Sequence, residues 1–213
     1  IIYLYKMNIM GDLSDNCGYL ELISGPMYSG KTSRLLRLHK QFKFCGISAL
    51  VINHSDDTLR YSTTQLSTHD QEMIDCIMVH SLNELIDLTK TSSIGIANEV
   101  FKNSKVILIN EIQFFQEDAI EWIKRAVDIH HKHVYVCGLD GDFQRKNFGN
   151  WLEELIPFCD NYVKLHSYCS ECKKKKAIFT HRLTSETAQK IIGSNCYIPL
   201  CRLCYNRKNS NKL

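Results

Sequence analysis

A polyphosphate could be bound by one run of eight residues, Gly25-Pro26-Met27-Tyr28-Ser29-Gly30-Lys31-Thr32. The run fits the pattern G-x-x-x-x-G-K-[S/T] and follows directly on the strand-like segment Tyr19–Ser24. Backbone N–H groups of a glycine-bounded loop can converge on an anion, and the N-terminus of the following helix adds a partial positive charge. In this pattern Lys31 reaches the terminal phosphates and the Thr32 hydroxyl ligates Mg²⁺. The sequence therefore predicts a nucleotide-binding P-loop.

Two further residues that could take part in the chemistry follow another apolar run. Val106–Ile109 ends in Asn110 and Glu111, an arrangement similar to a Walker B strand, although the first position here is Asn rather than an acidic residue. A carboxylate at this strand end lies beside the γ-phosphate and can accept the proton of an attacking hydroxyl. Glu111 is therefore the predicted general base.

Four of the ten cysteines form two pairs with the spacing of metal ligands, Cys169-x-x-Cys172 and Cys201-x-x-Cys204. Each pair presents two thiolates from one turn, which suits a tetrahedral Zn²⁺ ion, and the pattern predicts one structural zinc per chain. The separation between the pairs exceeds the usual spacing of a zinc ribbon and implies a long excursion between them. The other cysteines are scattered and are predicted to be reduced thiols: Cys17, Cys45, Cys76, Cys137, Cys159 and Cys196.

The segments that must position these groups alternate between strand-like and helix-like patterns. Apolar runs of strand length mostly lack period-2 alternation, which is typical of strands buried on both faces. They are Tyr19–Ser24, Ala49–Asn53, Val106–Asn110, Val134–Leu139 and Tyr162–Leu165. Helical patterns between them are Thr32–Phe44, Leu82–Leu88, Asp118–Ile129 and Asn150–Cys159. This alternation predicts an α/β fold with a P-loop and a doubly wound parallel sheet, whose strand ends carry the ligand site.

Length and composition fit one sizeable core with a small appended module. The chain has 213 residues, of which 44% are hydrophobic. After Leu165 the pattern changes to paired cysteines and a lysine run, so we predict a P-loop domain at 19–166, a zinc module at 167–206 and a tail at 207–213. Residues 1–18 are expected to be an N-terminal extension, with Met7 or Met10 as the true start.

Charge and hydropathy argue against some classes of partner. No apolar stretch approaches the length of a membrane span and no secretory signal is recognisable, so we expect a cytoplasmic protein without a membrane partner. The formal net charge of +3 is too small to indicate nucleic acid, and Lys173–Lys176 is interpreted as a solvated loop. His130, His131 and His133 have no ligand partners in the sequence and are interpreted as surface residues.

Aromatic residues gather in the segments that follow the predicted strands: Phe114, Phe115, Phe143, Phe148 and Tyr197. For any one of them a place in the core is the ordinary alternative. A planar apolar substrate such as a nucleobase would explain why several lie beside phosphate and base machinery.

Five motifs together carry a resemblance to a known family. They are Gly-Pro-Met-Tyr-Ser-Gly-Lys-Thr, Asp-Thr-Leu-Arg-Tyr-Ser, Asn-Glu-Ile-Gln-Phe-Phe, Leu-Asp-Gly-Asp-Phe-Gln-Arg-Lys-Asn-Phe-Gly and Cys-Arg-Leu-Cys-Tyr. From about Tyr19 to Tyr205 the chain resembles the zinc-containing (type II) thymidine kinases of cells and large DNA viruses. The resemblance implies transfer of the γ-phosphoryl of ATP to the 5′-hydroxyl of thymidine or deoxyuridine, with Mg²⁺.

The resemblance also assigns residues to roles. It makes Glu111 the proton acceptor and implies an ATP-binding set: Gly25, Pro26, Met27, Tyr28, Ser29, Gly30, Lys31, Thr32, Asp57, Arg60, Asn110 and Gln113. The excursion between the cysteine pairs corresponds to a segment called the lasso, whose backbone binds the base. The implied substrate-binding set is Met27, which touches the thymine methyl, with Phe114, Phe143, Gln189, Lys190, Ile191, Ile192, Gly193 and Tyr197. Arg145 falls in the same string as Phe143. Two departures are Asn110 in place of the usual Asp and an extra residue, Leu59, in the Asp57 loop.

The same resemblance implies a homotetramer that is inhibited by the end product thymidine triphosphate. The rival interpretation is a P-loop ATPase whose zinc ribbon and Lys173–Lys176 bind nucleic acid. The rival leaves the string Asp140-Gly141-Asp142-Phe143-Gln144-Arg145 unexplained. We therefore expect a kinase with ATP and thymidine as partners and no nucleic acid.

Overall fold

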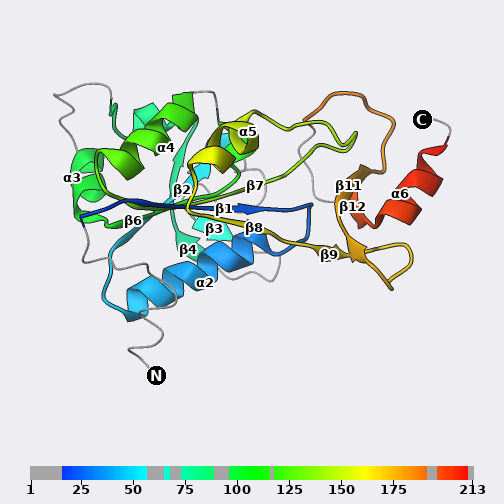
Figure 1. Ribbon diagram of the computed structural model, residues 1–213, viewed down its shortest axis with the longest axis horizontal. Helices are drawn as coiled ribbons and strands as arrows, with labels where there is room; N and C mark the ends of the chain where they lie inside the picture. Colours follow the sequence, from blue (N-terminus) through cyan, green and yellow to red (C-terminus); the bar gives the residue numbers. More distant parts are fainter. Residues whose placement is uncertain are drawn as a thin grey trace.

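A six-stranded parallel sheet forms the centre of the computed structural model, which describes residues 16–56, 65–67, 73–88, 96–115, 118–190 and 196–210. The strand order is β5-β2-β6-β7-β1-β8 (Figure 1). The strands are β1 Tyr19–Ser24, β2 Ala49–His54, β5 Ile77–Val79, β6 Val106–Ile109, β7 His133–Gly138 and β8 Asn161–Lys164. All neighbouring strands in this sheet pair in parallel, which confirms the predicted fold class.

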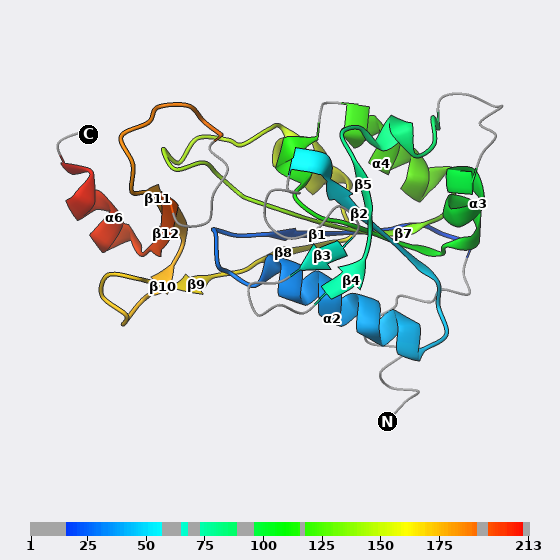
Figure 2. The same ribbon diagram turned by 180° about the vertical axis from the view of Figure 1, so that it is seen from behind.

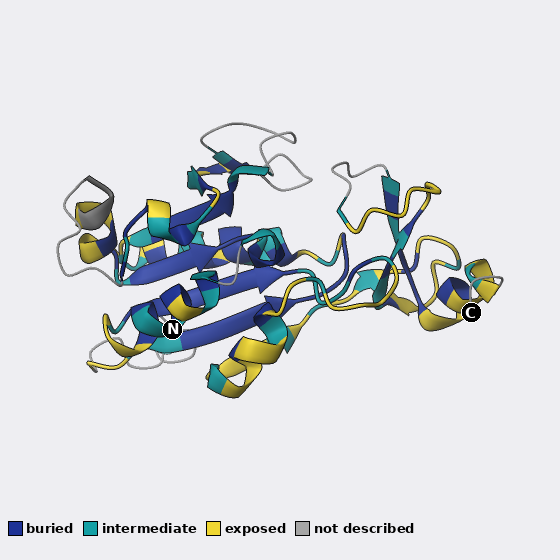
Figure 3. Ribbon diagram, turned by 90° about the horizontal axis from the view of Figure 1, so that it is seen from above, coloured by how far each residue is buried: buried dark blue, intermediate teal, exposed yellow. Residues whose placement is uncertain are grey.

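Helices cover both faces of the sheet, as Figures 1 and 2 show. The helix α2 (Lys31–Phe44) packs on one face, and α3 (Ile96–Asn103), α4 (Asp118–Asp128) and α5 (Trp151–Leu155) pack on the other. Successive residues of each strand serve opposite faces. In β6, Ile107 and Ile109 join the cluster around Trp122 of α4, whereas Val106 and Leu108 join the cluster around α2. The central strands are therefore buried on both sides (Figure 3).

The small C-terminal module lies beyond the carboxyl ends of β1 and β8 (Figure 1). It contains two antiparallel pairs, β9 (Ser167–Tyr168) with β10 (Lys176–Ala177) and β11 (Phe179–Arg182) with β12 (Tyr197–Leu200). The helix α6 (Arg202–Lys208) closes it, and its core contains four cysteines. A further hairpin, β3 (Gln65–Ser67) with β4 (Met73–Asp75), packs on the α2 face through Leu66 and Ile74.

Most predicted elements lie within one residue of the observed ones. The helix predicted over Asn150–Cys159 is α5 followed by the 3₁₀ turn η4 (Ile156–Phe158). The helix predicted over Leu82–Leu88 is wrong, because only the 3₁₀ turn η2 (Leu82–Glu84) forms there. Side chains of α4 hold the segment that follows this turn: Trp122 Nε1 donates to Ile86 O and Arg125 Nε donates to Leu88 O.

The interpretation of the histidines as surface residues is wrong for His133. This residue begins β7, is 3% exposed and stacks on Tyr19 with ring centroids 5.6 Å apart. Burial, and next the charge of Lys105, lower the pKa of His133 to about 4. The Lys173–Lys176 run is exposed, as predicted. None of the helices in the described ranges is long and apolar enough to cross a membrane.

Candidate active site

The loop between β1 and α2 needs its glycines for two different reasons. At Gly25, where φ is 154°, an added side-chain carbon would lie 2.7 Å from both the Ser29 hydroxyl and the Leu165 carbonyl oxygen. Gly30 has open space around it but a φ of 83°, which L side chains rarely adopt. The Ser29 hydroxyl oxygen is buried and has no hydrogen-bond partner among the described residues. The loop can thus offer N–H groups and a hydroxyl to an anion.

Lys31 and Thr32 begin α2 directly behind this loop. The Lys31 ammonium group is buried and donates to the carbonyl oxygens of Gly25 at 3.1 Å and Pro26 at 2.9 Å. It therefore lies against the inner side of the loop. The Thr32 hydroxyl donates to Asn110 Oδ1 at 3.5 Å, which joins the P-loop to the end of β6.

Asn110 occupies a buried, neutral position that sequence reasoning left undescribed. The residue is 1% exposed, and its Nδ2 donates to Asn53 Oδ1 at 2.9 Å. The Cys137 thiol donates to Asn110 Oδ1 at 3.0 Å. Asn53, Asn110 and Cys137 come from the ends of β2, β6 and β7, so the sheet edge gathers polar groups as expected of a ligand-binding edge.

Glu111 adopts a left-handed backbone conformation, with φ 53° and ψ 43°, immediately before the 3₁₀ turn η3 (Ile112–Phe114). Such a conformation costs a non-glycine residue of order 1–3 kcal/mol, and residues held in it cluster at functional sites. Gln113 Nε2 donates to Glu111 Oε2, and Gln113 Oε1 accepts from the Leu139 backbone N–H at 3.0 Å. At Gly138 a side-chain carbon would lie 2.6 Å from Gln113 Oε1. Gln113 thus spans β6 and β7 and holds the Glu111 carboxylate.

The four cysteines of the small module meet as predicted. The four sulfur atoms all lie within 4.8 Å of one another, and those of Cys172 and Cys201 are 3.9 Å apart; the residues are Cys169, Cys172, Cys201 and Cys204. Zinc–sulfur bonds of about 2.3 Å in a tetrahedron put sulfur atoms about 3.8 Å apart, so the donor set fits Zn²⁺.

The protonation chemistry of the cluster fits the same ion. Backbone N–H groups near Cys172, first that of Lys174, donate to its sulfur and lower the pKa of its thiol. Burial and the three neighbouring sulfurs raise the pKa of the Cys204 thiol. A cation between the four sulfurs would offset the mutual repulsion of their thiolate forms, so the cluster could hold zinc.

A family model described as thymidine kinase matches residues 18–205. The chain belongs to the thymidine kinase family. It is 36% identical to the cytosolic thymidine kinase of Homo sapiens over 95% of this chain and 79% of that protein. It is 35% identical to that of Gallus gallus, over 92% of this chain and 80% of the relative. The thymidine kinase of Monkeypox virus is 37% identical, over 89% of this chain and 98% of that protein. The protein is therefore a kinase.

Two aromatic rings from the predicted substrate set lie under cations. The Lys190 ammonium lies 4.4 Å from the centroid of Phe114, whose ring also meets Phe148 edge-on at 5.7 Å. The Arg182 guanidinium lies 3.7 Å from the centroid of Phe143. Both rings thus have one face or edge fixed by the protein.

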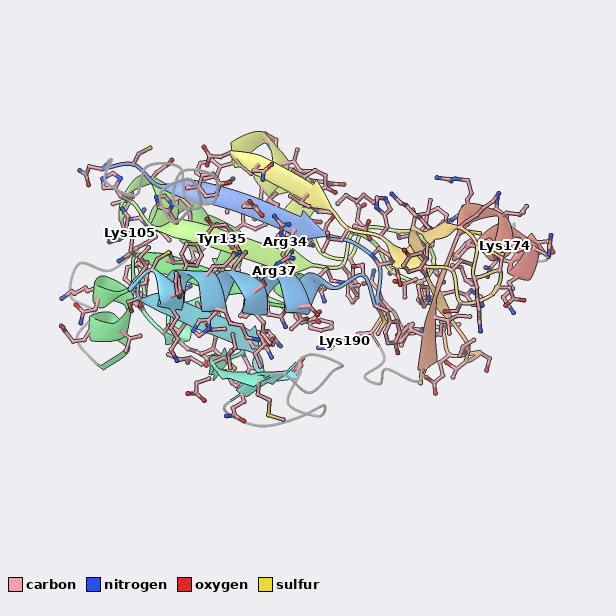
Figure 4. The ribbon with its side chains drawn as sticks, turned by 90° about the horizontal axis from the view of Figure 1, so that it is seen from below. Arg34, Arg37, Lys105, Tyr135, Lys174 and Lys190 are labelled. Atoms are coloured by element: carbon pink, nitrogen blue, oxygen red, sulfur yellow. The ribbon has the colours of Figure 1, made fainter. Side chains whose placement is uncertain are left out.

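Two side chains of the lasso, Gln189 and Lys190, bind other parts of the molecule. Gln189 Nε2 donates to Asp142 Oδ2 at 3.0 Å and to the Asn147 carbonyl at 3.1 Å. Lys190 forms an ion pair with Asp56 that lowers the pKa of this carboxyl group. Figure 4 shows Lys190 near the junction of the α/β domain and the small module, whereas Lys174 lies at the module's far end.

The predicted residues Asp57, Arg60, Ile191, Ile192 and Gly193 lie outside the described residues. The remaining predicted nucleotide and substrate residues belong to the β1–α2 loop, the turn after β6, the loop after β7, and the lasso with β12. Arg145, from the same string as Phe143, has a φ of 66° and stacks on Tyr205 at 4.9 Å.

Sequence reasoning missed two residues of β11 that connect the parts of the site. The Thr180 hydroxyl accepts a hydrogen bond from the Met27 backbone N–H at 3.0 Å, which ties the P-loop to the small module. Arg182, two residues along, is 4% exposed and contacts the lasso. Alternating burial in Phe179–Arg182 places both side chains on one face. The four-residue strand carries no motif that could have identified them.

Proposed function

We propose that this kinase transfers the γ-phosphoryl group of ATP to the 5′-hydroxyl of thymidine or deoxyuridine, giving the nucleoside monophosphate and ADP. The observation that carries the proposal is the meeting of the P-loop with Asn110 and Glu111 at the sheet edge, through the 3.5 Å contact from Thr32 to Asn110. Phosphoryl transfer needs little covalent chemistry from a protein beyond positioning, charge stabilisation and a proton acceptor. This edge provides candidates for all three.

The phosphates of ATP would lie in the loop formed by Gly25–Thr32. Its N–H groups and the Lys31 ammonium would bind phosphate oxygens, and Lys31 would exchange the two loop carbonyls it now contacts for them. Asp57, Arg60, Asn110 and Gln113 complete the proposed ATP set. The Thr32 hydroxyl and the Asn110 amide oxygen are the groups that would hold Mg²⁺ or its water ligands, and the bound ion supplies charge neutralisation for the phosphates.

Glu111 is the proposed general base. Its carboxylate follows β6 directly and Gln113 fixes one of its oxygens, so the other oxygen can accept the proton of the substrate hydroxyl. The strained backbone at Glu111 sets the direction of this side chain.

The nucleoside would be bound by Met27, Phe114, Phe143, Tyr197 and the lasso at Gln189, Lys190, Ile191, Ile192 and Gly193. Phe114 and Phe143 offer faces for a planar base. Backbone groups of the lasso would hydrogen-bond the base, and the entropic cost at Gln189 and Lys190 would be low because Asp142 and Asp56 already hold these two residues.

The proposed zinc has a structural role, because Cys169, Cys172, Cys201 and Cys204 fill a tetrahedral shell. We also propose the division into a P-loop domain at 19–166 and a zinc and lasso module at 167–206. A homotetramer, inhibition by thymidine triphosphate and a cytoplasmic location remain proposals drawn from the family resemblance.

The reaction is tested by identifying the acceptor and the product. The purified chain is incubated with Mg²⁺, γ-labelled ATP and thymidine, and nucleotides are separated by chromatography. We expect labelled thymidine 5′-monophosphate in equal amount to ADP, and no labelled monophosphate when 5′-deoxythymidine replaces thymidine. ATP consumption that responds to DNA and ignores nucleosides would instead establish a nucleic-acid-dependent ATPase.

A further inference from the structure

Arg182 is a buried cation at the end of β11, just before the part of the lasso that it contacts. Its Nη1 donates to the carbonyl oxygen of Glu186 at 2.9 Å and to that of Ala188. Its Nη2 donates to the Gln189 carbonyl at 2.9 Å and to the Tyr197 hydroxyl at 2.6 Å. One guanidinium group therefore holds three carbonyls of the lasso between residues 186 and 189, and also the Tyr197 side chain.

The same guanidinium packs against the aromatic residues of the site. Its central carbon lies 3.7 Å from the centroid of Phe143 and 5.1 Å from that of Tyr197. The Phe143 backbone is fixed separately, because the Tyr205 hydroxyl donates to the Phe143 carbonyl at 2.6 Å. Tyr205 follows Cys204 and packs in the cysteine cluster. A continuous set of contacts thus leads from the cysteines through Tyr205, Phe143 and Arg182 to the lasso.

The chemistry of these contacts requires arginine rather than any cation. All hydrogen-bond partners of Arg182 within the described residues are neutral, so its buried charge is stabilised by carbonyl dipoles, a hydroxyl and ring faces. Only a planar fork can donate to several carbonyls in different directions while its face stacks on a ring, whereas a lysine ammonium is a compact point charge. A buried charge with this many directional contacts fixes the relative positions of all its partners.

We propose that Arg182 is the positioning residue of the nucleoside site: it fixes Phe143, Tyr197 and residues 186–189 of the lasso in the arrangement that binds the base. The proposal rests on the proposed function, because Phe143, Tyr197 and the lasso are assigned to the nucleoside there. Within the part of the chain that the structure describes, the hydrogen bonds and ring contacts of Arg182 go to the lasso, Tyr197 and Phe143, so it acts on the nucleoside side of the site. Its loss should therefore weaken nucleoside binding selectively.

The test replaces Arg182 by lysine, which keeps the charge, and by glutamine, which keeps a donor without the charge. The matched control is Arg202→Lys, because Arg202 also stacks on an aromatic ring of the small module, Phe179 at 5.0 Å, but is exposed. The KM for thymidine is measured at saturating ATP, and the KM for ATP at saturating thymidine. Zinc content is measured for every protein.

We expect both Arg182 variants to raise the KM for thymidine at least about 10-fold, the scale of one lost hydrogen bond to a charged group. The KM for ATP should stay within about twofold, with one zinc per chain retained, because loss of uniform binding to one substrate changes its KM alone. Arg202→Lys should match the wild type. A second measurement uses Tyr197→Phe: its effect on the thymidine KM should be smaller in the Arg182→Lys background than in the wild type, because the two residues share a hydrogen bond.

The inference is overturned if either folded Arg182 variant has a thymidine KM within about twofold of the wild type, or if both KM values rise equally. Additive effects of Arg182→Lys and Tyr197→Phe would also contradict it. If the wild-type chain does not phosphorylate thymidine at all, the proposed function fails instead. An active wild type with unaffected Arg182 variants removes only the positioning role.

Discussion

Gln113 connects the Glu111 carboxylate to the backbone of Leu139, so the end of β6 is tied to the end of β7 through one amide side chain. The amide uses its nitrogen for the carboxylate and its oxygen for the 3.0 Å bond from Leu139 N–H. The side chain is buried, and Gly138 leaves the space it occupies. The direction of the Glu111 carboxylate is therefore set by two neighbouring strands.

Replacing Gln113 by methionine should remove both hydrogen bonds while keeping an unbranched side chain of similar length. The Glu111 carboxylate would lose its fixed direction, and misplacement of a reacting group on the scale of 1 Å can cost about 10²-fold in rate. We expect kcat at saturating ATP and thymidine to fall by about 10- to 100-fold. An unchanged kcat in a folded variant would show that Glu111 does not depend on Gln113.

The Asn110→Asp variant tests the electrostatics of the metal side. A carboxylate adds Coulomb attraction for Mg²⁺ beside Thr32, so the half-saturating free Mg²⁺ concentration should shift downward. Without Mg²⁺ the same carboxylate is buried next to Asn53 and should lower the thermal midpoint of unfolding, which Mg²⁺ with ATP should restore. The measurements are Mg²⁺ titrations corrected for the Mg·ATP complex and thermal melts.

The control for this variant is Asn103→Asp, which adds the same charge at an exposed position at the end of α3. It should leave the Mg²⁺ titration unchanged, and Mg²⁺ with ATP should not restore any change in its thermal midpoint. Superimposable Mg²⁺ titrations of the wild type and Asn110→Asp would mean that position 110 does not interact with the ion.

The cysteine cluster should support nucleoside binding through the lasso, whose two ends it anchors. Cys201→Ser removes one thiolate and should lower zinc content and raise the KM for thymidine more than the KM for ATP. Cys17→Ser, at an exposed cysteine outside the cluster, is the control and should change neither value. Wild-type protein purified without chelators and found to lack zinc would overturn the assignment of the module.

His133 should make the protein less stable at mildly acidic pH. Burial lowers its pKa to about 4, whereas an unfolded histidine titrates near about 6.5. As the pH falls through this window the unfolded chain binds a proton that the folded chain does not, so stability is lost. At about pH 5 the loss attributable to His133 is about 2 kcal/mol, and His133→Gln should remove it.

Urea denaturation at about pH 7 and pH 5 measures this effect as the difference in unfolding free energy between the two conditions. His166→Gln, at an exposed histidine, should keep the wild-type difference. Equal pH sensitivity of the wild type and His133→Gln would contradict the role of the buried imidazole.

The fold could be predicted from sequence where local chemistry decides it. Runs such as Val106–Ile109 are apolar on both faces because the strand is covered on both sides, and the P-loop glycines are required by their backbone angles. The interpretation failed where distant residues decide. Side chains of α4 bind the carbonyls of Ile86 and Leu88 in the segment after η2, and no local pattern shows these contacts.

The same limit applies to the site. Lys31, Thr32 and the cysteine pairs could be found because their chemistry is fixed by spacing along the chain. Asn53 and Asn110 are far apart in sequence and meet only because β2 and β6 pair in the sheet. Arg182 is a single arginine in a short strand, and its partners lie on a different loop, on β12 and on the lasso. Their roles follow from tertiary contacts that a single sequence does not display.

Glu111→Gln tests the central claim most directly, because the amide keeps the shape of the carboxylate and cannot accept the substrate proton. The measurement is the steady-state rate of thymidine monophosphate formation by wild type and variant at saturating ATP and thymidine, with ATP binding measured in parallel. We predict that the variant binds ATP like the wild type but turns over at least ~10²-fold more slowly, the scale of a lost general base. A turnover within a few-fold of the wild type would contradict the assignment of Glu111 as the base.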